Sequence, residues 1–93
     1  MSVLERLAPR ILRRNRHYRT AFSGPAGEFV RDDLFRLGHI GAPTHVDGDP
    51  ARTAFNEGKR FMALHIGSVL NMSDEEILQR AQQQAKTEND DGG

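Results

Sequence analysis

The side chains best suited to chemistry in this 93-residue sequence are arginines near its start. Arg10 lies four residues after Arg6. Arg13 and Arg14 lie three and four residues after Arg10. In a helix these spacings place guanidinium groups on one face, where they can bind phosphates or the carboxylates of a partner. No aromatic residue is interleaved for base stacking. The pattern therefore favours a solvated face or ion pairs between subunits, with nucleic acid as the alternative.

A second group of polar side chains precedes residue 50 and consists of His45, Asp47 and Asp49. These residues offer nitrogen and oxygen ligands for a metal ion. An EF-hand loop counted from Asp49 would need a bidentate glutamate at its twelfth position, where Arg60 stands. We therefore expect a turn at Asp47-Gly48, a helix cap at Asp49 and no metal site.

The remaining bases and nucleophiles form no catalytic set. The four histidines are spread over separate predicted elements, and no Glu or His lies four residues from His65, as a metalloprotease pattern requires. Gly24 and Gly27 lack the lysine and the preceding strand of a phosphate loop. Cysteine is absent, which excludes a thiol nucleophile, a disulfide framework and a zinc ribbon. The sequence predicts no catalytic residues, no cofactor and no enzyme.

The net charge of zero hides an asymmetry along the chain. Residues 1–20 hold six arginines against one acid, Glu5, a balance of +5, whereas residues 71–93 hold two bases against six acids, a balance of −4. Opposed ends favour head-to-tail contacts between copies, or a basic arm that reaches an acidic surface. No apolar run approaches the ~20 residues that span a bilayer, and no secretory core follows the arginines. We expect a soluble protein that is not exported.

The elements that must position these side chains are helices. The helix with the clearest apolar pattern runs from Pro50 to Leu70. Asp49 is a suitable N-cap, and Pro50 fits the first helical position because its missing N–H costs nothing there. The buried stripe of this central helix is predicted at spacings of seven, four and three residues: Phe55, Met62, Ile66 and Val69.

Other residues of the central helix are candidates for contact with partners. Phe61 and Leu64 widen the apolar arc and are predicted to face a neighbouring protein. Glu57 and Arg60 are predicted to form an ion pair, either on the free surface or as a clamp between subunits. Gly58 lowers helix stability by up to ~1 kcal/mol relative to alanine, so we expect it to permit the close approach of the helix Pro25–Leu37.

Three further helices are predicted around the central one. The first begins at the capping pattern Ser2-x-x-Glu5, and Pro9 should kink it or mark its true start. The second, Pro25–Leu37, should end at a left-handed Gly38 and bury Phe29, Val30, Leu34 and Leu37. The loop from His39 to Gly48 should be pinned by Ile40 and Val46. The last helix has a capping box of Ser73 and Glu76, with Met72 and Ile77 as a hydrophobic staple.

The predicted fold class is all-α, a small bundle of three to four helices around the central helix Pro50–Leu70. We divide the chain into a basic amphipathic N-terminal helix or arm (1–20), a helical domain (21–86) and an acidic flexible tail (87–93). A domain of this size buries roughly 60–65% of its unfolded surface and is modestly stable alone, so self-association or a partner would help it.

Two segments of this sequence, joined by a proline-containing loop, carry a family resemblance: Ala21-Phe22-x-Gly24-Pro25-x-Gly27-x-x-Val30-x-x-Asp33-Leu34 and Ala54-Phe55-x-Glu57-Gly58-x-Arg60. The combination resembles a family of small proteins encoded among the structural genes of tailed bacteriophages, typified by one in a Bordetella podophage. The resemblance covers about residues 18–80 and leaves out the arginine-rich start and the acidic tail.

The resemblance implies a component of the virion or of its assembly, and it brings no catalytic residues. The expected location is the virion, after synthesis in the host cytoplasm, at the capsid, the portal or an internal core associated with ejection. The expected partners are further copies and other virion proteins, with packaged DNA as a possible partner of the N-terminal arginines. The alternative from a different functional class is a small helical adaptor or DNA-binding regulator in the infected cell.

Overall fold

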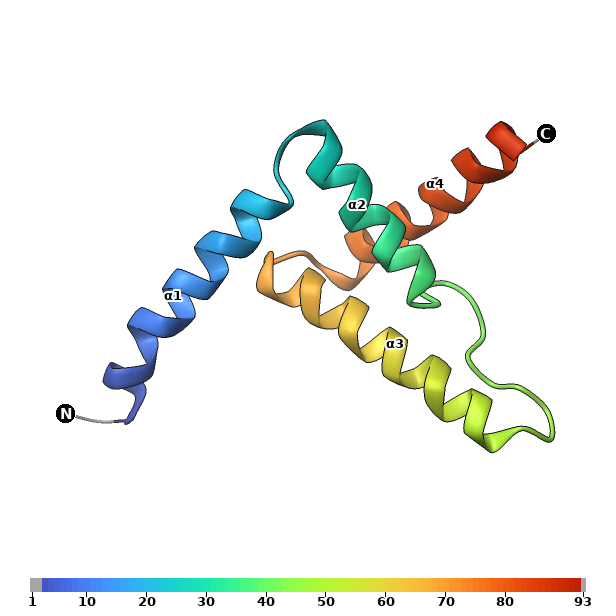
Figure 1. Cartoon of the computed structure of the whole chain (residues 1–93), viewed down its shortest axis with the longest axis horizontal. Coiled ribbons are helices and arrows are strands. Elements are labelled where there is room, and N and C mark those ends of the chain that lie inside the picture. Colours follow the sequence, from blue (N-terminus) through green and yellow to red (C-terminus); the bar gives the residue numbers. More distant parts are fainter. Residues whose placement is uncertain (1–2, 93) are drawn as a thin grey trace.

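The computed structural model describes the backbone of residues 3–92 and the side chains of residues 8–87. Four helices follow one another along the chain: α1 (Val3–Ala21), α2 (Gly24–Leu37), α3 (Pro50–Val69) and α4 (Asp74–Gly92) (Figure 1). No strand occurs within the described backbone. The prediction of an all-α bundle of three to four helices is confirmed.

The bundle is formed by α2, α3 and α4, whereas α1 projects away from it (Figure 1). Helix α2 packs against both α3 and α4. Helix α1 reaches the bundle near its C-terminal end, where the Tyr18 ring meets the ring of His65 on α3 edge-on at 6.2 Å between centroids. Most of α1, including its arginines, therefore lies beside the bundle rather than in it.

Two helix starts form as the sequence predicts. Asp49 Oδ1 accepts a hydrogen bond from the backbone N–H of Arg52 at 2.9 Å, and Pro50 is the first residue of α3. Before α4, Ser73 Oγ accepts from the Glu76 N–H at 3.2 Å, and Glu76 Oε1 accepts from the Ser73 N–H at 3.2 Å. These caps satisfy backbone donors that have no partner within a helix.

The core lies where α2, α3 and α4 cross. Its buried apolar residues are Phe35, Ile40, Ala63, Ile77 and Ala81, and Leu64, Ile66 and Met72 pack against them. The loop between α2 and α3 is held to this core through Ile40, as predicted, and through the buried Thr44, whose carbonyl oxygen accepts a hydrogen bond from Asn56 Nδ2 at 3.0 Å. The core is small for a chain of this length.

The predicted buried stripe of α2 is wrong. Phe29, Val30 and Leu37 are exposed, and the residue of α2 that is fully buried is Phe35. The apolar residues of α2 surround much of its circumference, so periodicity alone did not identify the face that packs. The helix turns Phe35 inward because this side chain fills the space between α3 and α4.

The predicted buried stripe of α3 is wrong in its first half. Phe55 and Met62 are each 58% exposed, and the face turned inward carries Asn56, Ala63 and Gly67 instead. A Cβ at position 67 would overlap with the side chain of Ile77 on α4. Small residues therefore form the packing face of α3 because the neighbouring helices come too close for large ones.

The glycine predictions are also wrong. Gly58 is exposed, and a Cβ added there would meet no atom within 4 Å, so α2 does not approach it. The close contact between α2 and α3 occurs at Gly38, where a Cβ would overlap with that of Ala63. Gly38 has φ of −81°, and the left-handed conformation that ends α2 belongs to His39 with φ of 59°.

Helices α1 and α4 each extend beyond a boundary that the sequence predicts. Helix α1 begins at Val3 and contains Pro9, so it does not start at Pro9, while Ser2 lies outside the described residues. Helix α4 continues to Gly92, so residues 87–92 extend the helix where the sequence predicts a tail. The flexibility of that tail stays a prediction.

The chain is extended for its size. Its radius of gyration is 15.8 Å, whereas a compact domain of 93 residues has about 12 Å. Its accessible surface is 6894 Å², about 1,500 Å² more than the ~5,400 Å² expected for a globular protein of its mass. The fold therefore leaves a large area that packing within one chain does not cover.

Candidate interaction surface

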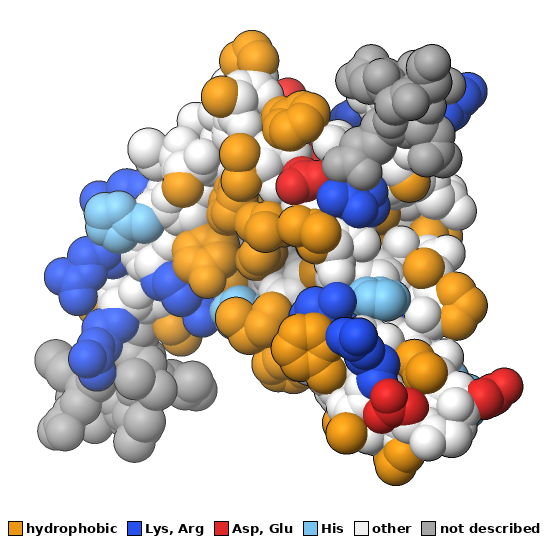
Figure 2. Space-filling model, turned by 45° about the vertical axis from the view of Figure 1, so that its right-hand side comes forward, with side chains coloured by type: hydrophobic (Ala, Val, Ile, Leu, Met, Phe, Trp, Pro, Cys, Tyr) orange, Lys and Arg blue, Asp and Glu red, His pale blue; other side chains and the backbone are white. Residues whose placement is uncertain are grey.

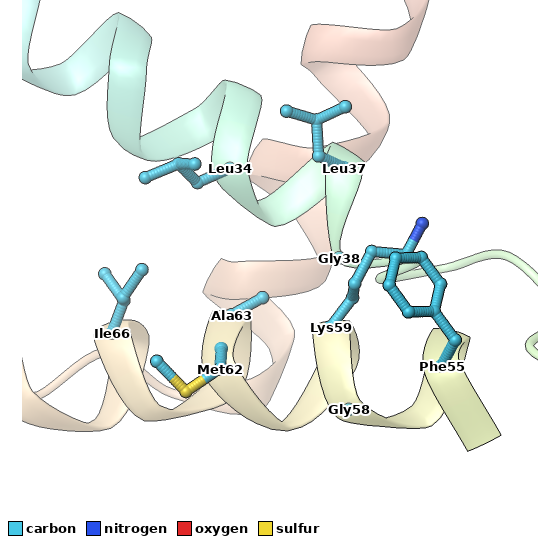
Figure 3. Close-up of a pocket in the computed structure, with 9 residues that line it drawn as sticks. All are labelled: Leu34, Leu37, Gly38, Phe55, Gly58, Lys59, Met62, Ala63 and Ile66. Atoms are coloured by element: carbon cyan, nitrogen blue, oxygen red, sulfur yellow. The ribbon is translucent and has the colours of Figure 1, made fainter.

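An apolar groove runs between α2 and α3. It has a volume of about 480 Å³, and Figure 3 shows its walls: Leu34, Leu37 and Gly38 from α2 and the turn after it, and Phe55, Gly58, Lys59, Met62, Ala63 and Ile66 from α3. Leu34 lies across the opening from Ile66, whereas the Leu37 side chain is turned away from α3 (Figure 3). The groove forms because the helices touch at Gly38 and Ala63, while larger side chains on either side hold their flanks apart.

The charged residue among those lining the groove is Lys59. Its ammonium group lies 5.0 Å from the centroid of the Phe55 ring, a cation–π distance. This contact holds Phe55 at the edge of the groove rather than inside it (Figure 3). The groove therefore offers an apolar floor with one basic group at its rim.

Exposed hydrophobic residues continue from the groove over the adjoining face. Figure 2 shows hydrophobic side chains gathered in the middle of this face, between the basic residues of α1 and the lower part of α3. Phe29 and Val30 on α2 and Phe61 on α3 are among the exposed ones, and Phe61 is 70% exposed. An apolar area of this kind marks a site of protein contact more often than ordinary surface.

The residues of α3 predicted to contact partners lie in different surroundings. Phe61 is exposed, whereas Leu64 is half-buried and packs against the core. Glu57 accepts a hydrogen bond from the hydroxyl of Thr44, and Arg60 lines a separate hollow beside Asp74. Glu57 and Arg60 form no ion pair with each other within the chain, where the loop before α3 supplies the partner of Glu57 instead, and a clamp between subunits stays a prediction.

The predicted phosphate or carboxylate contacts lie on α1. Arg10, Arg13 and Arg14 are exposed, and Arg14 Nη2 donates to Asn15 Oδ1 at 3.0 Å. The side chain of Arg6 lies outside the described residues. Arg10, Arg13 and Arg14 are more than a helix turn from Tyr18, where α1 meets α3, so they are open to an acidic partner without rearrangement of the bundle.

The polar group before α3 is used in turns and caps. His45 Nε2 lies 3.0 Å from Asp47 Oδ1 on the surface, and Asp49 caps α3. Among the described side chains no three His, Cys, Asp or Glu residues come together as a metal site. His65, which the sequence places on α3, is half-buried against Tyr18.

The sequence interpretation missed the groove itself. The residues expected in the core that the structure places around the opening are Leu34, Leu37, Phe55, Met62 and Ile66, of which Ile66 also packs against the core. One signal pointed to them: the two helices carry more large apolar residues than a 93-residue bundle can bury. Which of these would remain outside depends on the close contacts at Gly38 and Gly67, which the apolar pattern does not show.

A comparison with models of known protein families identifies the family of this chain. The profile of the Bbp19-like phage proteins matches residues 18–83, more than two thirds of the chain. The chain belongs to the Bbp19-like phage protein family. No curated protein and no solved structure matches it significantly. The resemblance to a phage family is thereby confirmed.

The Bbp19-like segment contains the whole groove. It begins at Tyr18, the residue that joins α1 to α3, and it includes all of α2 and α3 and the first half of α4. Arg10, Arg13 and Arg14 lie before it. The features that this chain shares with Bbp19-like proteins are thus those of the bundle. No helix in the described part of the chain is both long and apolar enough to cross a lipid bilayer.

Proposed function

We propose that this Bbp19-like phage protein is a non-enzymatic structural or assembly component of a tailed-phage virion. It is made in the host cytoplasm and acts in the particle, at the capsid, the portal or an internal core associated with ejection. It works through contacts between helices. Its partners are other virion proteins and further copies of itself.

The observation that carries this proposal is the uncovered apolar face of α2 and α3. A single chain with so thin a core and about 1,500 Å² of surplus surface gains stability when a neighbour covers that face. Assemblies repeat such contacts by symmetry. The family match to phage proteins supports a phage particle as the setting of these contacts.

Mass spectrometry of purified particles tests the proposal. Particles of the phage or prophage that carries the gene are separated on a density gradient and digested, and peptides of this chain are quantified against the major capsid protein. We expect a fixed ratio across the particle peak. Confinement of the chain to the lysate, with none in the particles, would contradict a structural role.

A second candidate function is a DNA-binding regulator or adaptor in the infected cell, which the exposed arginines of α1 favour. Fluorescence anisotropy of the full chain with duplex DNA tests it. A regulator should bind with an affinity that falls steeply as salt rises, and replacement of Arg10, Arg13 and Arg14 by glutamate should abolish binding. Flat or absent binding at low salt would leave the structural role alone.

A further inference from the structure

Gly58 lies at the centre of the exposed face of α3. Residues three and four positions away on either side point within about 60° of it on the helix. All of them are exposed: Ala54, Phe55, Phe61 and Met62. A glycine inside a helix lowers stability by up to ~1 kcal/mol, and here a side chain would meet nothing within 4 Å. The bundle itself gives no reason for a glycine at this position.

The residues around Gly58 are arranged so that the face complements itself. If a second α3 lies antiparallel with its own Gly58 opposite, each position n residues before Gly58 meets the position n residues after it. Phe55 then shares a layer with Phe61 of the other copy. Ala54 shares a layer with Met62, a small side chain beside a large one. Glycine at the crossing lets the two backbones approach closely.

The area available suits such a contact. The whole chain, with its projecting α1, exposes about 1,500 Å² more than a globular protein of its mass, and a standard interface buries ~800 Å² of each partner. Phe55 and Met62 also line the groove, so a helix seated over Gly58 covers part of the groove opening. The residues in the two layers are all uncharged, so charge repulsion does not oppose the contact at its centre.

We infer that a second copy of this chain docks on α3, antiparallel and related by a two-fold axis that passes beside Gly58. The contact is isologous, with the same residues contributed by both copies. This inference rests on the proposed function in one respect: it names self-association as one of the contacts by which the virion component assembles. The pairing is nevertheless a property of the isolated chain.

Sedimentation equilibrium of the purified full chain gives the first test. We expect a monomer–dimer equilibrium. The substitution Gly58→Leu should weaken it at least tenfold, because a leucine side chain holds the helices apart. Since nothing in the monomer contacts this position, circular dichroism should show unchanged helicity. Gln79→Leu, which adds the same side chain to an exposed position on α4, is the matched control and should dimerise as the parent does.

Cysteine cross-linking tests the direction of the pairing, and the absence of native cysteine makes it clean. Chains carrying Ala54→Cys and chains carrying Met62→Cys are mixed and oxidised. We expect a disulfide-linked dimer in the mixture and none from either variant alone, because an antiparallel pair separates identical positions by about 12 Å along the axis. A parallel pair would link each variant to itself.

Three results would overturn the inference: a monomer at every concentration, a dimer that Gly58→Leu leaves intact, or cross-links of identical positions. None of these bears on whether the chain is found in particles. Failure of self-association and failure of the virion role are therefore separate outcomes. Presence in particles together with a monomeric chain would direct attention to other virion proteins as occupants of α3.

Discussion

At the scale of single residues, two glycines on the same helix have opposite surroundings. Gly67 faces Ile77, whose side chain fills the place of a Cβ, whereas Gly58 faces open space. The difference arises because α4 crosses α3 at residue 67 and no helix crosses it at residue 58. Substitution of Gly67 therefore reports on packing between helices, whereas substitution of Gly58 reports on helix propensity.

Gly67→Ala should lower the free energy of unfolding by about 1–3 kcal/mol, because the added methyl group overpacks against Ile77. Gly58→Ala should raise it by up to ~1 kcal/mol through helix propensity. Urea denaturation at low protein concentration, where the monomer dominates, measures both. Equal effects of the two substitutions would show that α4 does not pack on α3 at Gly67.

The capping box of α4 makes a second residue-scale prediction. Ser73→Ala removes the acceptor of the Glu76 N–H and should cost about 1 kcal/mol of unfolding free energy. Ser68→Ala, at an exposed site without a cap, is the control and should change stability little. Thermal denaturation compares the two variants, and a Ser73→Ala protein as stable as the parent would contradict the cap.

At the scale of elements, α1 is held to the bundle through few contacts. One of them is the edge-on meeting of Tyr18 and His65, and Tyr18 also lies 6.2 Å between ring centroids from Phe22 in the turn after α1. A helix held at one end should open more readily than α2 or α3.

His65→Ala should therefore speed hydrogen exchange in α1 and leave the exchange of α2 amides unchanged. His17→Ala, which alters an exposed histidine on α1 itself, is the control and should have no effect. Mass spectrometry of peptides from each helix measures the rate of hydrogen exchange. Equal acceleration in all helices would mean that His65 supports the whole bundle rather than α1.

The helix starts at Asp49 and Ser73 could be predicted from the sequence, whereas the helix faces could be predicted only in part. The caps at Asp49 and Ser73 depend on residues within one turn, so local spacing is sufficient. The inward face of α3 depends on Ala63 and Gly67, which contribute no apolar signal although they lie in the closest contacts. Tertiary packing chose small residues over the Phe55 and Met62 stripe.

The candidate surface was predicted only in part, because it too depends on tertiary packing as well as on local spacing. Phe61 was expected outside and is exposed, and the arginines of α1 with described side chains are exposed as well. The pairing of Glu57 with Thr44 could not be foreseen, because it depends on a loop that folds back over thirteen residues. Local spacing predicted the contacts within a helix, and of the contacts between elements it predicted the burial of Ile40.

At the scale of the whole molecule, stability should depend on concentration. A dimer that forms from folded chains stabilises them by mass action. The midpoint of thermal unfolding should therefore rise as the concentration increases from micromolar to millimolar. For Gly58→Leu the same rise should need at least tenfold higher concentrations, and scanning calorimetry at several concentrations provides the measurement. A constant midpoint for the parent chain would contradict self-association.

The projection of α1 turns helix length into distance. Its 19 residues extend about 28 Å, and only one end is fixed to the bundle. A partner that binds the exposed arginines and a partner that occupies the groove are consequently separated by a distance that the length of α1 sets. Shortening α1 by whole turns would therefore bring these two partners closer in steps of about 5 Å.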